Sequence, residues 1–278
     1  MRNFSYADGA QKAQSITSGI IVGTRKAGTT WLYENFRRDP RVSVSELVKE
    51  SGYFSGSAQL DRKSYDALQN SEGQGHRIEV DSSVCYADAA PDLLDAYNSE
   101  MRVVLIFREP SAFLASRHVH SLRKGELSEK SAIAAYENNE WLRRELDYPA
   151  ITKRFQRFHE QGRLNVFAYE QMKVDPVGFY TDVLTALNVT KQDGFLPDTA
   201  PVNVSRSTKL PLASAAFSKG AVTARRLGLH GLVNALKSTG IHKIIETTHN
   251  QKSIGPNDSY AAEVGALVPH SVELHKSL

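Results

Sequence analysis

The residues best suited to chemistry lie in one short loop, where Gly23 and Gly28 flank Lys26 and precede Thr29 and Thr30. Glycines let the backbone turn tightly and bring its N–H groups close to an anion, and the start of a following helix adds a favourable dipole. The lysine adds a mobile positive charge, and the threonines add hydroxyl donors. The spacing therefore predicts a cradle for a phosphate group rather than a turn without a ligand.

This loop departs from the pattern of nucleoside-triphosphate-binding loops. That pattern reads G-x-x-x-x-G-K-[ST], and here Thr29 stands where its lysine would be. The apolar run 101–107 ends in Arg108, where a magnesium-holding aspartate would be expected. These departures disfavour an ATP-dependent small-molecule kinase, which is kept as the first alternative. The second alternative, a non-catalytic nucleotide-binding module, is disfavoured because Lys26, Arg108 and Ser116 are all present.

Two buried strands must position these groups. The runs 19–23 and 101–107 are short, apolar and rich in β-branched residues, which is typical of buried strands. A helix is predicted over 29–37, and Pro110 starts another because its missing N–H is not needed in a first turn. With a further strand at 164–169, the alternation predicts a P-loop-type α/β fold: three layers, with a mostly parallel central sheet flanked by helices.

Composition is that of an ordinary globular enzyme. The 278 residues are 41% hydrophobic and 23% charged, with a net charge of +3 and one cysteine. One domain is predicted over 1–278, with a core over about 19–210 and a C-terminal helical extension over 211–278. About the last thirty residues are polar and are expected to be poorly ordered.

Several partners and locations are disfavoured. The mild charge lacks the clustered basic residues of nucleic-acid-binding proteins. The polar N-terminus and the lack of an apolar run of about 20 residues predict no transmembrane segment and a cytoplasmic location. A basic amphipathic stretch over 223–245 is expected to pack on its own domain, with peripheral contact to a membrane surface or glycolipid as the alternative.

Two motifs on the strand–helix junctions resemble those of sulfotransferases that use 3′-phosphoadenosine 5′-phosphosulfate (PAPS). VGTRKAGTTWLYENF resembles their 5′-phosphosulfate loop, K-[SATG]-G-T-T-x-L, and IFREPSAFLASRHVH resembles their 3′-phosphate motif, R-[DN]-P-x-x-x-x-x-S. Glu109 replaces the usual Asp or Asn of the second motif. Weaker likenesses, through LVKESGYFSG and LPDTAPVNVSRSTKL among others, extend to about residue 210. They are most similar to the heparan-sulfate and bacterial carbohydrate branch.

The resemblance implies PAPS as co-substrate and no metal. Arg108 would grip the 3′-phosphate bidentately, and Ser116 would add a hydroxyl. Trp31 would stack on adenine or serve as core. Arg206 and Lys209 would close over the 3′-phosphate or lie in a solvated loop. The implied donor-binding residues are Arg25, Lys26, Ala27, Gly28, Thr29, Thr30, Trp31, Arg108, Ser116, Arg206 and Lys209.

Transfer of a sulfuryl group needs a stabilised leaving phosphate and a base for the acceptor. The resemblance gives the first task to Lys26. Glu50 is the first choice of base, because it matches the family's catalytic glutamate in a K-E-x-x-[FY]-F element. Its alternative interpretation is a solvated pair with Lys49 on a loop.

A second candidate base, His120, lies on the predicted helix after Pro110. It follows Ser116 by four residues, so the two share a helix face, and a histidine titrates near neutral pH. Related N-sulfotransferase domains carry a histidine at the matching place. His118 points elsewhere and is expected at the surface.

The resulting hypothesis is in-line transfer of a sulfuryl group from PAPS to a hydroxyl or amine. The branch implies an acceptor that is a carbohydrate, a glycolipid or a glycosylated metabolite. EVDSSVCY, at 79–86, stands where relatives have E-K-x-P-x-Y-F, but the lysine and proline are absent. Cys85 is expected to be a buried filler.

Overall fold

The computed structural model describes residues 16–69, 75–190, 195–200 and 257–278. Its centre is a five-stranded sheet in the order β2-β3-β1-β4-β5, and every neighbouring pair is parallel. The chain builds one half of the sheet and then crosses to the other side of β1. In such sheets ligands bind beyond the carboxyl ends of the strands, at this change of direction. The strands are β1 (Gly19–Ile21), β2 (Val42–Ser43), β3 (His76–Val80), β4 (Arg102–Phe107) and β5 (Leu164–Ala168).

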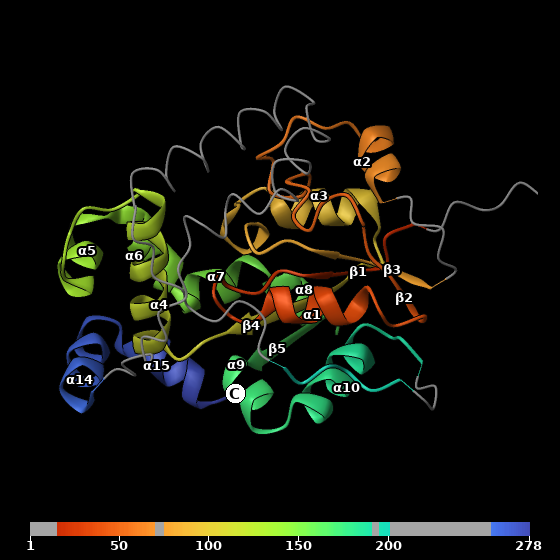
Figure 1. Cartoon of the computed structure of the whole chain (residues 1–278). Helices are drawn as coiled ribbons and strands as arrows, with labels where there is room; N and C mark the ends of the chain where they lie inside the picture. Colours follow the sequence, from red (N-terminus) through yellow and green to blue (C-terminus); the bar gives the residue numbers. More distant parts are fainter. Residues whose placement is uncertain (1–15, 70–74, 191–194, 201–256) are drawn as a thin grey trace, which may run out of the picture.

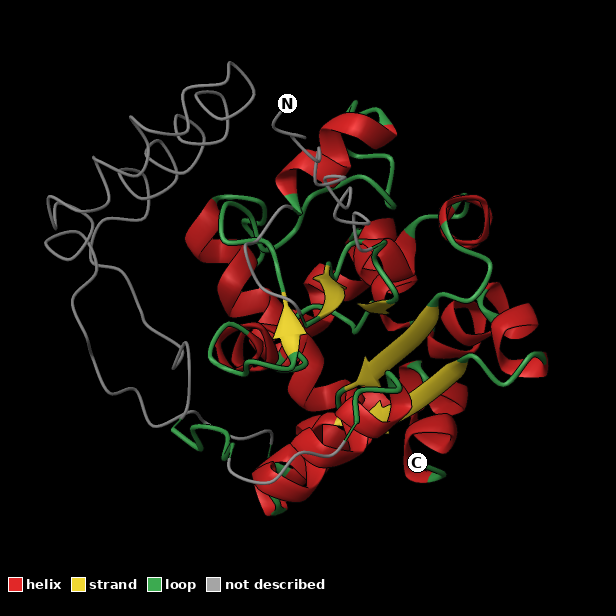
Figure 2. Ribbon diagram, turned by 90° about the vertical axis from the view of Figure 1, so that its right-hand side faces the viewer, coloured by secondary structure: helices red, strands yellow, loops and turns green. Residues whose placement is uncertain are grey.

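Helices cover both faces of the sheet, as two views at right angles show (Figures 1 and 2). The helices α1 and α10 lie on one face, and α3 lies on the other (Figure 1). The described helices are α1 (Thr29–Phe36), α2 (Arg62–Leu68), α3 (Ala90–Tyr97), α4 (Pro110–Lys124), α5 (Ala132–Asn138), α6 (Glu140–Leu146), α7 (Tyr148–Arg154), α8 (Gln156–Glu160), α9 (Tyr169–Val174), α10 (Pro176–Ala186), α14 (Asp258–Leu267) and α15 (Pro269–Lys276).

Strand β4 shows why a continuous apolar run becomes a central strand. Val103, Leu105 and Phe107 belong to the core cluster that includes residues of α3 and α4. Val104 and Ile106 belong to the cluster on the other face, with residues of α1 and α10. All five are fully buried. Alternate side chains of a strand point to opposite faces, so both faces must be apolar when helices cover both.

The helix after β4 begins at an unusual but effective cap. The carboxylate of Glu109 accepts hydrogen bonds from the backbone N–H groups of Ser111 and Ala112, at 3.0 and 2.7 Å. Pro110 occupies the first helical position, where its missing N–H costs nothing. Glutamate therefore performs the capping role that an Asp or Asn would perform.

The predicted α/β fold and the strands at 19–23, 101–107 and 164–169 are confirmed, with ends shifted by one or two residues. The expectation of poor order at the C-terminus is wrong for 257–278, because α14 and α15 form there and pack on α4 and α7. The basic stretch 223–245 lies outside the described residues. Within the described segments, no helix has both the length and the apolar content needed to cross a bilayer.

Candidate active site

The loop after β1 is held in a strained, open shape. Lys26 and Gly28 both have left-handed backbone, with φ of 66° and 80°. Thr24 fixes the loop to β4, since its N–H and its hydroxyl both donate to the carbonyl of Ile106, at 2.8 and 3.0 Å. Gly28 is the N-cap of α1 and supplies no side-chain bond to that helix. Because the first turn of a helix carries unpaired N–H groups, this terminus is suited to receive an anion.

Gly28 is also required by close packing against α9. A Cβ at this position would lie 2.9 Å from Cε2 of Tyr169. The guanidinium of Arg108 also lies over the Tyr169 ring, 5.0 Å from its centroid, as does Nζ of Lys173 at 4.9 Å. One aromatic ring therefore contacts both the phosphate loop and the arginine at the end of β4.

Arg108 reaches directly to the phosphate loop. Its Nη1 donates to the carbonyl oxygen of Lys26 at 3.1 Å. Its Nε is buried, and no acceptor among the described residues meets it. A buried donor without a partner costs free energy, so this group is suited to an acceptor brought by a ligand. The two strand ends are adjacent, as the sequence predicts.

The region around Lys26 is strongly cationic. Burial lowers the pKa of Lys26 to about 8, and the positive charges of Arg123, Arg108, Arg117 and Lys124 act in the same direction. Like charges brought close to a buried lysine disfavour its charged form. A bound anion would relieve that repulsion, which is the electrostatic character expected of a phosphate site.

Arg25, a predicted donor-binding residue, turns its side chain toward α6. Its guanidinium is paired with Glu145, whose side chain is 4% exposed and is also bound by Arg117 at 2.8 Å. Its backbone N–H donates to the hydroxyl of Tyr86 at 3.1 Å. The side chain of Arg25 thus ties the phosphate loop to α4 and α6. Nothing in the sequence pattern linked Glu145 to the loop.

Glu50 lies at the opening of the loop. Nζ of Lys49 bonds to Oε1 of Glu50 at 2.9 Å and to Oγ1 of Thr29 at 3.2 Å. Ser82 donates to the same carboxylate oxygen at 2.8 Å. Burial works against ionisation of Glu50, but Lys49 and Ser82, with Arg25 farther off, hold its pKa below the usual range. The structure therefore brings Glu50 to the phosphate loop as a carboxylate.

Two carboxyl groups of the β3 end hold the segment that follows Glu50. The N–H of Ser51 donates to Glu79 at 3.1 Å, and that of Gly52 donates to Asp81 at 3.0 Å. Burial and the charge of Asp81 raise the pKa of Glu79 to about 8, and burial also raises the pKa of Asp81. In the sequence this segment is distinguished only by its missing lysine and proline, and its pattern does not predict β3.

Of the two histidines of α4, His120 lies on the expected side of the helix and His118 does not lie at the surface. His120 is half-buried, and burial followed by the charge of Lys26 lowers its pKa to about 3. This places the neutral imidazole on the side of α4 near the phosphate loop, with Ser116 one turn earlier. The surface prediction for His118 is wrong, since it is 6% exposed and its Nε2 lies 2.6 Å from the carbonyl oxygen of Glu129.

Of the remaining predicted residues, Trp31 and Cys85 lie in the core, and two others lie in segments that the structure does not describe. Trp31 is 4% exposed, donates through Nε1 to the carbonyl of Asp198 at 2.8 Å, and meets Tyr180 edge-on. Cys85 is fully buried, which confirms it as a filler. Arg206 and Lys209 lie outside the described residues.

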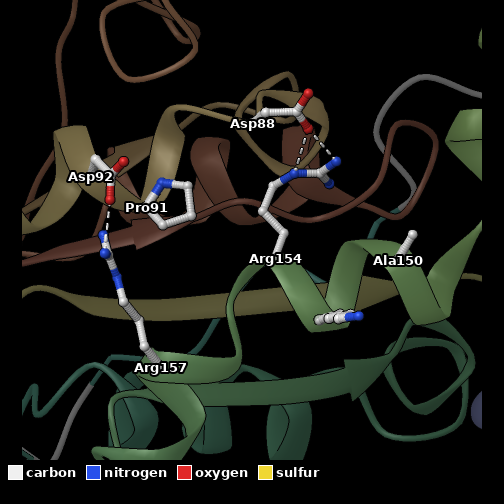
Figure 3. Close-up of a pocket in the computed structure, with 7 residues that line it drawn as sticks. Asp88, Pro91, Asp92, Ala150, Arg154 and Arg157 are labelled. Carbon is white, nitrogen blue, oxygen red and sulfur yellow. Dashed lines mark hydrogen bonds and ion pairs between the residues drawn. The ribbon is translucent and has the colours of Figure 1, made fainter.

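A separate surface depression between α3, α7 and α8 contains none of the predicted site residues. Its two arginines are already paired, Arg154 with Asp88 at 2.6 Å and Arg157 with Asp92 at 2.7 Å (Figure 3). Arginines compensated in this way are poorly suited to attract an anionic ligand. The candidate site is instead the group of residues around the phosphate loop, where Arg108 bonds to the carbonyl of Lys26 and Lys49 joins Glu50 to Thr29.

Comparison with known proteins identifies the family and the fold. The sulfotransferase domain family model matches residues 17–193. No curated protein sequence matches the chain significantly. Among solved structures, a sulfotransferase from Alicyclobacillus acidocaldarius superposes with a TM-score of 0.58 at 20% identity, covering 78% of this chain and 95% of that one. Mouse sulfotransferase SULT7A1, solved with PAP, gives a TM-score of 0.45 at 18% identity, covering 65% and 62%.

The first of these likenesses establishes the fold, and the family match includes both strand–helix junctions, the Glu50 loop and α4. Lys26, Glu50, Arg108 and Ser116 thus lie inside the matched region, whereas Arg206 and Lys209 lie beyond it. The chain belongs to the sulfotransferase family.

Proposed function

We propose that the protein transfers a sulfuryl group from PAPS to a hydroxyl or amine of an acceptor. The observation that carries this proposal is the 3.1 Å hydrogen bond from Arg108 to the carbonyl of Lys26. It places the guanidinium of Arg108, at the end of β4, against the backbone of Lys26 in the loop that follows β1. Two adjacent anion sites suit a nucleotide that carries phosphate groups at both its 5′ and 3′ positions.

The 5′-phosphosulfate would be held by the loop. The start of α1, with the hydroxyls of Thr29 and Thr30, would bind its oxygens, and Lys26 would stabilise the charge on the leaving phosphate. Lys26 and its neighbouring cations supply the positive charge for that task, so the proposal requires no metal. When bound, PAPS supplies an activated sulfuryl group with a good leaving group.

The 3′-phosphate would be held by Arg108. Its unpaired Nε and its planar fork fit bidentate binding of a phosphate, and Ser116 would add a hydroxyl from α4. Arg206 and Lys209 remain proposed contacts from outside the described residues. Trp31 is proposed for the edge of the adenine site, although its indole packs in the core.

Glu50 is the proposed base. It is ionised at neutral pH because Lys49 and Ser82 hold its pKa low, and it lies beside the loop that would present the sulfuryl group. A base on this side allows in-line transfer, with the acceptor opposite the leaving phosphate. His120, a neutral imidazole near Lys26, is the second candidate.

The acceptor is proposed to be carbohydrate-containing: a sugar, a glycolipid or a glycosylated metabolite handled in the cytoplasm. This rests on the likeness of the Glu50 element to the carbohydrate branch.

The test is a pair of titrations followed by an activity assay. Adenosine 3′,5′-bisphosphate (PAP) should bind much more tightly than ATP with magnesium, measured by calorimetry on the full chain. Labelled sulfate should then pass from PAPS to members of a panel of sugars and glycolipids. Binding of ATP with magnesium but not of PAP would contradict the proposal and favour a kinase.

A further inference from the structure

The C-terminal helix α15 lies next to α9 although more than 80 residues of sequence separate them (Figure 1). It also lies outside residues 17–193, which match the family. Residues of α15 contact two side chains that hydrogen-bond to the peptide group between Arg108 and Glu109. One of these side chains binds the N–H of that peptide group, and the other binds its carbonyl.

The N–H of that peptide is bound through Glu170. The backbone N–H of Glu109 donates to Oε2 of Glu170 at 3.3 Å, and Nε2 of His275 lies 2.9 Å from the same oxygen. Since a carboxylate only accepts, Nε2 of His275 must carry a proton. Burial opposes ionisation of Glu170, but the hydrogen bond and charge of His275 bring its pKa below the usual range.

The carbonyl of the same peptide is bound through Tyr148. The hydroxyl of Tyr148 donates to the carbonyl of Arg108 at 2.7 Å. The backbone N–H of Tyr148 donates to Oγ of Ser271 at 3.2 Å, and Ser271 donates to the carbonyl of Leu146 at 2.6 Å. Tyr148 and Ser271 are both buried. Helix α15 therefore contacts the two residues that bind the two sides of this peptide.

Tyr169 adds a third connection. It precedes Glu170 in α9, and its ring lies under the guanidinium of Arg108. Residue 171 of the same helix is also bound to the chain end, since Nε2 of Gln171 donates to the carbonyl of Leu278 at 3.3 Å. A shift of α15 would therefore move both the backbone and the aromatic support of Arg108.

We infer that α15 sets the geometry of the 3′-phosphate site, with His275 as a positioning residue that acts on Arg108 through Glu170. This inference rests on the proposed function, because it takes Arg108 as the group that binds the 3′-phosphate. His275 itself does not touch the nucleotide. Its role is to hold an arginine whose bidentate binding depends strongly on orientation.

The readout is the ratio of two dissociation constants, that of adenosine 5′-monophosphate divided by that of PAP. This ratio isolates the 3′-phosphate, whereas a general loosening of the fold weakens both ligands. For His275→Ala we expect the ratio to fall about fivefold. His275→Gln keeps an N–H donor and should recover part of the loss. The matched control is His270→Ala, since His270 lies on the same helix with its side chain 82% exposed and should leave the ratio unchanged.

Glu170→Gln alters the same hydrogen bond from its other end, in α9, and serves as the test if His275→Ala does not fold. The inference is overturned if the ratio of dissociation constants is unchanged in the folded variants, or if both ligands lose affinity equally. Arg108→Ala separates the two levels of the proposal. If it removes the preference for PAP while His275 variants do not, only the inference fails. If the unmodified protein shows no preference for PAP, the donor assignment and the inference both fail.

Discussion

The two sides of the candidate site, on either side of β1, differ in how burial affects their charged groups. On the β4 side, burial and neighbouring cations lower the pKa of Lys26 to about 8. On the β3 side, burial and a neighbouring carboxylate raise the pKa of Glu79 to about 8. Both sides lie at carboxyl ends of parallel strands, so the backbone architecture is the same and only the side chains differ.

This difference indicates that one side is suited to bind a ligand and that the other side supports a loop. On the cationic side Nε of Arg108 meets no acceptor in the part of the chain that the structure describes, so this side is suited to bind an anion. The acidic side is internally satisfied, since Glu79 and Asp81 accept from the backbone of Ser51 and Gly52. It holds the loop that carries Glu50. Like charges are therefore grouped on both sides. The cations are suited to a bound anion, and the carboxyl groups hold the loop that carries Glu50.

The largest effect should come from the cationic side. Lys26→Ala removes the positive charge proposed to stabilise the leaving phosphate, and we expect transfer of labelled sulfate to fall by about a thousandfold. The fold should survive, as judged by thermal unfolding. Lys63→Ala, at an exposed position of α2, is the matched control and should retain activity. Comparable activity in both variants would contradict the role given to Lys26.

The second largest effect is expected at Glu50, on the β3 side of the site. Glu50→Gln should lower kcat about a hundredfold with little change in the affinity for PAP, because it removes a base but keeps the shape of the side chain. His120→Asn should have the smaller effect. The reverse order of the two kcat values would transfer the role of base to His120.

A smaller effect concerns pH. If charged Lys26 is required, kcat/KM should fall above about pH 8 by up to about tenfold per pH unit, since the free protein loses this charge as pH rises through its lowered pKa. Lys26→Arg keeps its charge at any accessible pH, so its profile should stay level there. An alkaline limb that persists unchanged in Lys26→Arg would assign it to another group.

The smallest effect concerns stability. A carboxyl whose pKa is raised on folding binds more protons in the folded chain, so folding weakens as pH rises from the unfolded pKa toward about 8. The loss is at most about 1.4 kcal/mol of unfolding free energy per pH unit. Glu79→Gln should remove this component and unfold at a higher temperature than the unmodified protein at pH 8. Parallel pH dependence of the two melting curves would show that Glu79 titrates normally.

Local chemistry made part of the site predictable. A glycine-flanked lysine before a helix, an arginine after an apolar run and a proline at a helix start each act within a few neighbouring residues. The same holds for the fold class, because apolar runs alternating with helical periodicity leave few arrangements other than a parallel sheet between helices. The cap of α4 by Glu109 was not predicted, although it too is local, since its carboxylate accepts from the N–H groups of Ser111 and Ala112.

The sequence could not reveal β3, because polar Arg77 and Glu79 interrupt its apolar pattern and are buried only by tertiary contacts. The same is true of the partners that lie far apart in the chain. Arg25 and Glu145 are 120 residues apart, and Glu170 and His275 are 105 apart. The sequence by itself determined which groups could bind a doubly phosphorylated donor. The strand order and the packing of α15 decided which of them meet, because only the folded chain fixes distances between residues so far apart in sequence.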